Sequence, residues 1–433
     1  MRVASCGISA AAAASVRPPP IHPYASAREI ISRRQSLRRS SGKWQSPAAG
    51  LASRAAIPSF TGVNDPFPVS PPRTWAEIDL GALENNLGVA REAFGGALMA
   101  VVKAGAYGHG LEEIARTLAA QDIAFFGVAN VGEARRIRAA GVATPIYLLG
   151  ATWSEEREEI VAREWTPCIS SMDEAEEFNR LAAAAHKCLR VHLAVDTGMG
   201  RGGFVADHLP EVMGKLVRLE NLEVEGIGSH LPSADEDREF TRFQFQQFRT
   251  IIEELGGPGR FRWIHLSNSA GLLGYEPGIC NLGRPGLMLY GVSPLASESQ
   301  KQLRTVMTLK SRVTLVRILP TGHGISYGRQ FVTTRPTRVA TIGIGYGDGY
   351  PRHVSGNGAA VWIRGQRLPI LGRVTMDQMM VDVTAAEDVM EGDEVEIFGP
   401  NISVAEVADK AGTIVWEIFT GITPRVTRCY KPA

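Results

Sequence analysis

A lysine stands at the end of a short apolar run, where a buried strand would give way to a loop. Residues 97–102 are apolar and lead into Lys103, and glycines and a tyrosine follow at once as far as Gly110. Short apolar runs bounded by glycine are typical of buried strands, and a parallel strand is buried on both faces. Desolvation there favours the neutral amine, which can form a Schiff base with a carbonyl and then carry a proton. The alternative is a lysine whose apolar stem leaves a strand end and whose ammonium reaches solvent.

Other residues with chemical potential also follow predicted strands. Each has a structural alternative: a surface arginine after a turn, a structural histidine, or a pair of helix N-cap residues. A helix N-terminus with a serine also binds phosphate, and barrels commonly hold phosphate near their last strands. Because strand ends meet at one face of a barrel, the five positions together predict a site there. They are Lys103, Arg201, His230, Asn268–Ser269 and Arg284.

The elements that must position these residues alternate between strand and helix. About eight such units favour an α/β fold, a closed (β/α)8 barrel of the TIM type. An open doubly wound sheet is the alternative, but no Gly-x-Gly-x-x-Gly opens a helix after the first strand. Strands are predicted at 74–80, 97–102, 124–128, 146–149, 167–169, 189–195, 222–229, 262–265 and 287–290, with helices at 82–94, 111–120, 131–140, 154–163, 172–185, 209–217, 240–254 and 268–273.

The pattern changes after about residue 303, where short strands are separated by Gly and Pro. This predicts a C-terminal all-β domain. We therefore expect an N-terminal extension at 1–72, a barrel at 73–304 and a β domain at 305–433. The strand at 74–80 is a candidate for packing against the β domain instead of the barrel.

Charge is distributed unevenly along the 433 residues. Residues 1–73 hold ten Lys or Arg and two acids, which leaves 36 basic and 43 acidic residues beyond them. The mildly acidic body argues against nucleic-acid or anionic-membrane partners. The basic head, rich in Ala, Ser, Arg and Pro, is typical of an organelle transit peptide, and its composition favours a plastid (chloroplast) over a mitochondrion. A disordered extension without an address is the alternative.

Two further features concern membranes and thiols. No stretch is long and apolar enough to span a bilayer, so a soluble protein is expected. The five cysteines are scattered and form no Cys-x-x-Cys pair, which favours reduced thiols without a disulfide framework or a metal site. They are Cys6, Cys168, Cys188, Cys280 and Cys429.

Taken together, motifs along nearly the whole body resemble the alanine racemase family, fold-type III enzymes that use pyridoxal 5′-phosphate (PLP). No single motif is specific, but the set is. The matching stretches are AVVKAGAYGHG from Ala100, VDTGMGR from Val195, GIGSHLPSAD from Gly226, HLSNSAGLL from His265, NLGRPGLMLYG from Asn281, GISYGRQF from Gly324, GIGYGDGYPR from Gly343, GRVTMDQMMVDV from Gly372 and RVTR from Arg425.

This resemblance implies a racemase that interconverts L- and D-alanine with two bases. Lys103 would carry PLP and act as the base on the D-face. Tyr327 would be the opposing base, reaching the barrel mouth of a second subunit, so the protein would be a homodimer with shared sites. His230 would hydrogen-bond that tyrosine near Arg284 and His265. Without this context, Ile-Ser-Tyr-Gly around Tyr327 would be an ordinary turn with a packed tyrosine.

The resemblance also assigns the remaining site residues. Arg284 would face the pyridine nitrogen, and Arg201 would lie beside the phenolic oxygen and the substrate. Met376 and Asp377 would cross from the partner to the substrate carboxylate. The phosphate side would comprise Tyr107, Asn268, Ser269, Gly286, Leu287 and Trp416.

The residue types suit this chemistry. Two bases break and remake a Cα–H bond on opposite faces more simply than one mobile base. Lysine and tyrosine both have reference pKa values near 10, so each must be shifted to act near neutrality. PLP is the electron sink. An always-charged arginine at the ring nitrogen should keep that nitrogen unprotonated and limit side reactions such as transamination.

Three positions depart from the family pattern. Gly105 stands where Asp or Asn is usual, and Ala194 where many members have a carboxylated lysine that orients the arginine. Trp416 replaces a phosphate-binding tyrosine. Its N–H can still donate one hydrogen bond, but its bulk leaves serine or a broader substrate range as an alternative to alanine.

Two other PLP proteins are less similar to this sequence. A decarboxylase of the same fold type uses a cysteine-bearing partner loop and an acidic residue at the ring nitrogen, against which Tyr327 and Arg284 argue. A non-catalytic PLP-binding protein is a barrel alone and would lack the β domain.

Overall fold

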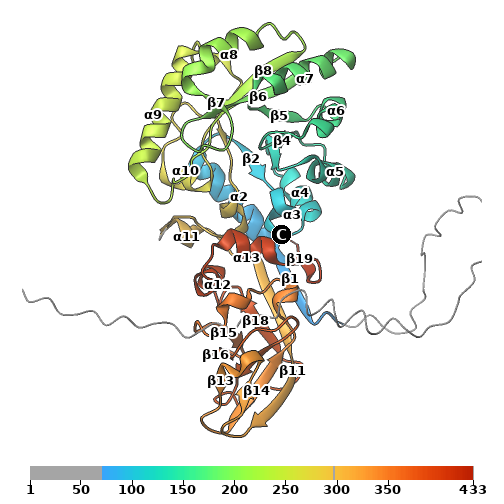
Figure 1. Cartoon of the computed structure of the whole chain (residues 1–433), viewed down its shortest axis with the longest axis vertical. Helices are drawn as coiled ribbons and strands as arrows, with labels where there is room; N and C mark the ends of the chain where they lie inside the picture. The colour runs from blue at the N-terminus through green and yellow to red at the C-terminus, as the bar shows by residue number, and fades with distance from the viewer. Residues whose placement is uncertain (1–70, 296–297, 433) are drawn as a thin grey trace, which may run out of the picture. The chain divides into compact units, whose positions relative to one another are not determined.

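A computed structural model describes residues 71–295 and 298–432 of the chain (Figure 1). The expected transit peptide lies almost wholly outside the described residues. Within them the chain builds a parallel barrel followed by a domain dominated by antiparallel strands, which confirms the predicted fold class.

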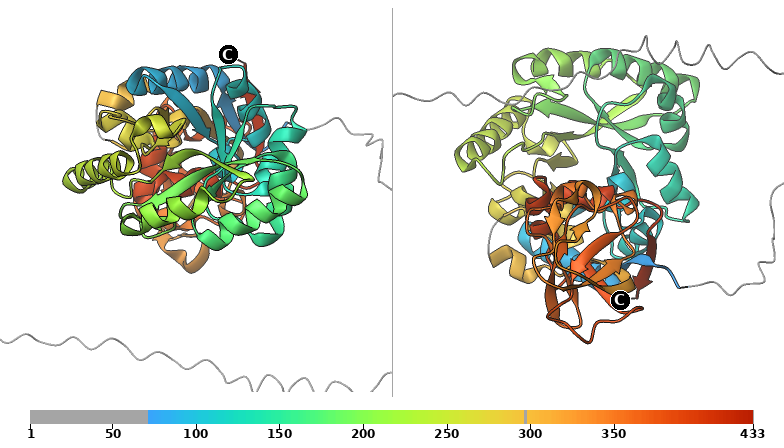
Figure 2. Two further views of the ribbon diagram at one scale, coloured as in Figure 1. Left: turned by 90° about the horizontal axis from the view of Figure 1, so that it is seen from above. Right: turned by 60° about the horizontal axis from the view of Figure 1, so that its bottom comes forward.

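The barrel has eight parallel strands with helices around them (Figure 2, left). The strand order is β10-β2-β3-β4-β5-β6-β8-β9. The ring is completed beside β9 and β10 by backbone bonds from Asn281 N–H to Ile264 O and from Arg284 N–H to Ser267 O, each 3.0 Å. The strands are β2 (Ala97–Val101), β3 (Phe125–Val128), β4 (Ile146–Leu148), β5 (Thr166–Ile169), β6 (Leu189–Asp196), β8 (Leu222–Gly228), β9 (Trp263–His265) and β10 (Leu282–Gly283).

Two of the barrel helices begin at an N-cap side chain that the sequence shows directly. Asn130 and Ser171 each accept a hydrogen bond from the backbone N–H three residues on, so each caps a helix. Apolar side chains on the inner face of each helix join one core with the strands. The helices are α2 (Leu80–Phe94), α3 (Lys103–Tyr107), α4 (Leu111–Ala119), α5 (Val131–Ala139), α6 (Ser154–Arg163), α7 (Met172–Ala184), α8 (Leu209–Leu216), α9 (Arg238–Glu254) and α10 (Ser269–Gly274).

The first predicted strand, β1 (Thr74–Asp79), does not belong to the barrel. It pairs antiparallel with β11 (Met307–Leu319) and parallel with β19 (Thr427–Lys431). A strand of a parallel barrel is covered on both faces, whereas β1 carries Glu77, whose carboxylate pairs with Lys310 at 3.0 Å and Lys431 at 2.6 Å. The strand therefore pairs with β11 and β19 of the second domain.

The predicted last barrel strand is also corrected. Residues Leu287–Tyr290 form a fully buried 3-10 helix, and the eighth strand is the preceding pair Leu282–Gly283. A short apolar run does not by itself distinguish a buried strand from a buried turn.

The second domain contains one eight-stranded sheet and a small hairpin. It is not all-β, because helices α12 (Val404–Ala411) and α13 (Val415–Gly421) follow its last antiparallel strand. The signal for α12 was present: Ser403 accepts a bond from Glu406 N–H, the spacing of a capping box. The remaining strands are β14 (Thr337–Ile342), β15 (Ala360–Ile363), β16 (Gln366–Leu371), β17 (Met379–Asp382), β18 (Glu394–Phe398) and the hairpin β12 (Gly324–Ile325) with β13 (Phe331–Val332).

Candidate active site

Lys103 lies just beyond the carboxyl end of β2, at the face of the barrel where the loops after the strands gather. Its side chain is half-buried. Burial lowers the pKa of the Lys103 amine, the charges of Arg201 and Arg284 lower it further, and Glu133 alone opposes them. The neutral amine that base chemistry requires is therefore favoured at this position.

The residues after Lys103 form a left-handed turn. Ala104, Gly105, Ala106 and Tyr107 all have positive φ, between 52° and 65°. The left-handed region is open to glycine and, among other residues, to Asn and Asp. Gly105 therefore satisfies the same backbone requirement as the Asp or Asn usual there, which gives this departure a physical reason.

Tyr107, Ser269 and Gly286 come together at one end of the site. Ser269 Oγ accepts bonds from Gly286 N–H at 3.0 Å and Met288 N–H at 3.3 Å. A Cβ at position 286 would lie 2.6 Å from the Tyr107 hydroxyl oxygen, so only glycine permits this approach. Burial raises the pKa of Tyr107 to about 12, which keeps the phenol neutral and able to donate.

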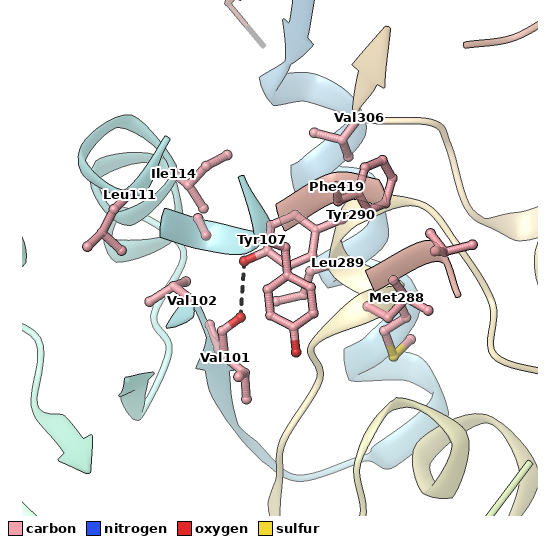
Figure 3. Close-up of a cluster of buried hydrophobic side chains, with 14 of the residues drawn as sticks. Val101, Val102, Tyr107, Leu111, Ile114, Met288, Leu289, Tyr290, Val306 and Phe419 are labelled. Carbon is pink, nitrogen blue, oxygen red and sulfur yellow. Dashed lines mark hydrogen bonds between the residues drawn. The ribbon is translucent and has the colours of Figure 1, made fainter. Parts of the chain in front are cut away.

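A second tyrosine, which sequence reasoning missed, supports Tyr107. The two rings of Tyr107 and Tyr290 stack with centroids 4.7 Å apart, and Tyr290 donates a 3.0 Å bond to Val101 O (Figure 3). Leu287 begins the 3-10 helix that carries Tyr290. This segment thus holds the carboxyl end of β2, the strand that precedes Lys103.

Asn268 has the structural role that the sequence left open. Its side-chain oxygen accepts the Gly271 N–H at 3.0 Å and caps α10, while its amide donates to Leu231 O at 3.1 Å. These contacts hold Ser269 in place at the start of the helix.

Arg284 is buried, and its guanidinium has only neutral partners among the described residues. It donates to Ser229 O at 2.6 Å and Leu266 O at 3.0 Å, and it contacts His265 Nδ1 at 2.5 Å and His230 Nδ1 at 3.3 Å. Burial and the charge of Arg284 lower the pKa of both histidines, to about 3 for His230. The site therefore holds a positive charge that no carboxylate neutralises directly.

A histidine pair, which the sequence did not single out as a unit, continues inward from Arg284. His265 and His192 lie 2.9 Å apart, Nε2 to Nδ1, and His192 Nε2 lies 3.6 Å from Glu225 Oε1. Because a guanidinium has no acceptor, His265 Nδ1 must accept and its Nε2–H must donate to His192. The pair thus continues inward from Arg284 as two neutral rings, and the second ring leaves its buried Nε2 without a hydrogen-bond partner among the described residues.

Arg201 follows a loop that is organised by Asp196. The carboxylate of Asp196 accepts backbone bonds from Gly198, Met199 and Gly200 at 2.8–2.9 Å. Ala194, on β6, offers no group to orient the guanidinium, and the side chain of Arg201 is exposed. The charges of Arg201, Arg284 and Lys103 all act on His230, which places the four residues in one electrostatic cluster.

Trp416 lies on α13, a helix that the sequence did not predict. The helix packs against the turn after Lys103, with the Phe419 ring 4.9 Å from the buried His109 ring. Arg428 donates to Gly108 O at 3.0 Å and ties β19 to the same turn. Trp416 is half-buried at the edge of this contact.

Tyr327, Met376 and Asp377 are not brought to Lys103 within one chain. Tyr327 is 67 % exposed and Met376 is 52 % exposed, both in the second domain. In the part of the chain that the structure describes, no hydrogen bond joins Tyr327 to Lys103 or His230. Asp377 instead pairs with Arg425 at 2.8 Å.

The residues present fit PLP. Phosphate is an anion, and the site offers the buried Tyr107 and Ser269 hydroxyls and the uncompensated charge of Arg284. The lowered pKa of the Lys103 amine favours the neutral form, which is the form that reacts with an aldehyde. Within residues 71–295 and 298–432, no group of His, Cys, Asp or Glu could hold a metal ion, and no helix is long and apolar enough to cross a membrane.

Comparisons with known proteins agree with this geometry. The family model for the alanine racemase N-terminal domain matches residues 78–294, and that for the C-terminal domain matches 306–430. An alanine racemase of Geobacter sp. strain M21 is 40 % identical over 374 residues, covering 82 % of this chain and 98 % of that protein. Alanine racemase of Methanococcus maripaludis is 38 % identical over 368 residues, with 82 % and 98 % coverage.

A solved structure extends the likeness to the cofactor. Alanine racemase from Bartonella henselae, crystallised with covalently bound pyridoxal phosphate, has a TM-score of 0.76 and 30 % identity, covering 83 % of this chain and 100 % of that one.

The relatives also correct one expectation. The basic head predicted a plastid in preference to a mitochondrion, but the two relatives named above are bacterial and archaeal proteins and give an organelle location no support. Composition alone did not distinguish a transit peptide from the alternative, an extension without an address. Sequence, fold and site agree that the chain belongs to the alanine racemase family of PLP-dependent isomerases.

Proposed function

We propose that the protein interconverts L- and D-alanine by moving a proton between two bases on opposite sides of the substrate Cα. The observation that carries this proposal is the Lys103 amine at the barrel mouth, whose pKa is lowered by burial, Arg201 and Arg284. A neutral amine there can take the proton from one face of Cα and return it to that face. Bound PLP supplies the electron sink for the negative charge that develops.

Tyr327 is the proposed second base, and a second copy of the chain supplies it. Its exposure, together with the lack of a hydrogen bond to its hydroxyl among the described residues, supports a role across a homodimer interface. Neutral His230 accepts from Arg284 at Nδ1, which leaves its Nε2–H to orient that phenol. The exposed Met376 and its neighbour Asp377 would come from the same second copy to the substrate carboxylate.

The remaining residues hold the cofactor and the substrate. Tyr107, Ser269 and the backbone at Gly286 and Leu287 bind the phosphate. Arg284 would face the ring nitrogen, and its charged guanidinium could not accept a proton there. Arg201 would contact the substrate.

A broader substrate range is the second candidate, raised by the residue type at position 416. An indole on α13 offers one donor and more bulk than the phenol usual there. If this position shapes the substrate end, L-serine should be racemised at a rate comparable to that of L-alanine.

Incubation of the holoenzyme with L-alanine in deuterated water tests the proposal. We expect D-alanine that carries deuterium at Cα, and no such product from Lys103→Ala. Ethylamine would identify a decarboxylase, and unchanged L-alanine a non-catalytic PLP-binding protein. Parallel reactions with L-serine, followed by chiral chromatography, decide the specificity.

A further inference from the structure

Glu133, which the sequence did not single out, joins two loops at the mouth of the barrel. It is 8 % exposed and lies in the first turn of α5. Its Oε1 accepts the Ala104 N–H at 2.5 Å, and its Oε2 accepts the Ala129 N–H at 2.9 Å. One carboxylate therefore binds the backbone directly after Lys103 and the backbone after β3.

The turn that Glu133 binds is conformationally costly. Ala104, Ala106 and Tyr107 are left-handed without being glycine, and each such residue is strained. Strain of this kind persists only where the surroundings hold it. Glu133 Oε1 binds the first amide of the turn, at the residue that follows the lysine.

We propose that Glu133 is a positioning residue for Lys103, whose carboxylate holds the left-handed turn in place so that the Lys103 amine and the Tyr107 hydroxyl face one site. This inference rests on the proposed function, in which Lys103 is one of the two bases. Glu133 acts through the backbone of Ala104 and as the negative charge beside the lysine.

The charges around Lys103 make this role measurable. The groups that face it are Arg201, Arg284, His230 and Glu133, and only Glu133 is negative. Its charge raises the pKa of Lys103 against burial and the two arginines. Loss of the carboxylate charge should therefore lower the pKa of the amine while it frees the turn.

The barrel contains a matched control. Glu174, 2 % exposed on α7, bonds the loops after β4 and β5 in the same way: Oε1 accepts the Thr152 N–H at 3.1 Å and Oε2 accepts the Ser170 N–H at 2.9 Å. Both glutamates follow an N-cap residue by three positions. Glu174 is not among the groups that shift the pKa of Lys103.

The experiment compares holoenzyme variants E133Q, E133D and E174Q. Gln keeps the shape of Glu but only one acceptor oxygen, so one of the two amides loses its partner.

For E133Q we expect amide hydrogen exchange in residues 103–110 to rise about tenfold or more, and kcat to fall roughly 10- to 100-fold. The acid limb of the kcat–pH profile for D-alanine should move to lower pH, because the amine loses its negative neighbour. E133D should retain that limb, and E174Q should change neither the limb nor the exchange of residues 103–110.

Equal effects of E133Q and E174Q on all readouts would overturn the inference, because both glutamates would then be ordinary scaffold residues. Unchanged exchange at residues 103–110 in E133Q would do so as well. Failure of the proposed function gives a different result: wild-type holoenzyme would not racemise alanine, while amide exchange would still report on Glu133.

Discussion

The Arg284 guanidinium lies 2.5 Å from His265 Nδ1, and this contact fixes the direction of the hydrogen bond between His265 and His192. Arginine can only donate, so His265 accepts on one side and donates to His192 at 2.9 Å on the other. The buried cation is thus held by neutral groups, with Glu225 reached only through two rings. A proton acceptor at the position of Arg284 would reverse that polarity.

Substitution of Arg284 by Glu should change what the enzyme makes. A carboxylate can share a proton with the ring nitrogen, which strengthens charge delocalisation and favours transamination. We expect racemisation to slow and pyruvate to form from L-alanine, with the amino group transferred to the cofactor as pyridoxamine phosphate, measured as the pyruvate to D-alanine ratio. R284K, which keeps the charge, should make little pyruvate. An unchanged ratio in R284E would contradict the assigned role of Arg284, provided that thermal unfolding shows a folded variant.

The Tyr327→Phe variant tests whether different bases act on the two faces of the substrate Cα. Enantiomers have equal free energies, so kcat/KM must fall equally in both directions, and exchange with solvent is the informative measurement. In deuterated water, Y327F should still exchange the Cα hydrogen of D-alanine through Lys103, without inversion, while exchange of L-alanine should fall at least roughly 100-fold.

The matched control is Tyr275→Phe, which removes a hydroxyl that donates to Ala234 O at 3.2 Å outside the cluster around Lys103. It should leave both exchange rates near the wild-type values. If Y327F slowed exchange of both enantiomers to the same extent, the two-face assignment would be rejected.

The effect of a substitution at position 105 should depend on how well the new residue adopts a positive φ, and not on steric contacts of its side chain. A Cβ at Gly105 meets nothing within 4 Å, but φ is +65°. We expect G105N to leave the free energy of unfolding within about 1 kcal/mol of wild type and G105V to lower it by about 1–3 kcal/mol, measured with urea. The control is Gly88 in the interior of α2, also without a neighbour within 4 Å, where G88A should stabilise by about 0.5–1 kcal/mol.

The free energy of unfolding should decrease at acid pH, because histidines that are buried in the neutral form must then be protonated. Burial lowers the pKa of His109 to about 4, against about 6.5 for an unfolded chain. Between these values the unfolded state binds more protons, so the contribution of His109 is complete above pH 6.5 and is lost as the pH falls towards 4. The slope should be about 1.4 kcal/mol per pH unit for this residue.

Unfolding of the holoenzyme at several pH values between 4 and 7.5 measures this slope. H109Q should reduce the slope, whereas the exposed-site variant H208Q should preserve it. An identical pH dependence for wild type and H109Q would show that His109 does not titrate in this window.

The sequence by itself determined the parts of the molecule that depend on local pattern. Strand and helix alternate with the periods of the two elements, so the barrel and the β-rich second domain were predicted correctly. Lys103 follows a strand because an apolar run and its glycines lie next to it in the chain. The sequence also predicted one cluster for Arg201, His230 and Arg284, because the carboxyl ends of the parallel strands of a barrel lie at the same face.

Only the tertiary structure decided which distant residues meet. Glu133 and Ala104 are separated by 29 positions and His192 and His265 by 73, and nothing in a local pattern pairs them. Local pattern also does not predict that β1 pairs with β19 at the far end of the chain. Nor does it predict that α13 packs against the turn after Lys103. Such contacts depend on long-range packing and on which buried polar groups find partners, and these are settled only when the whole core closes.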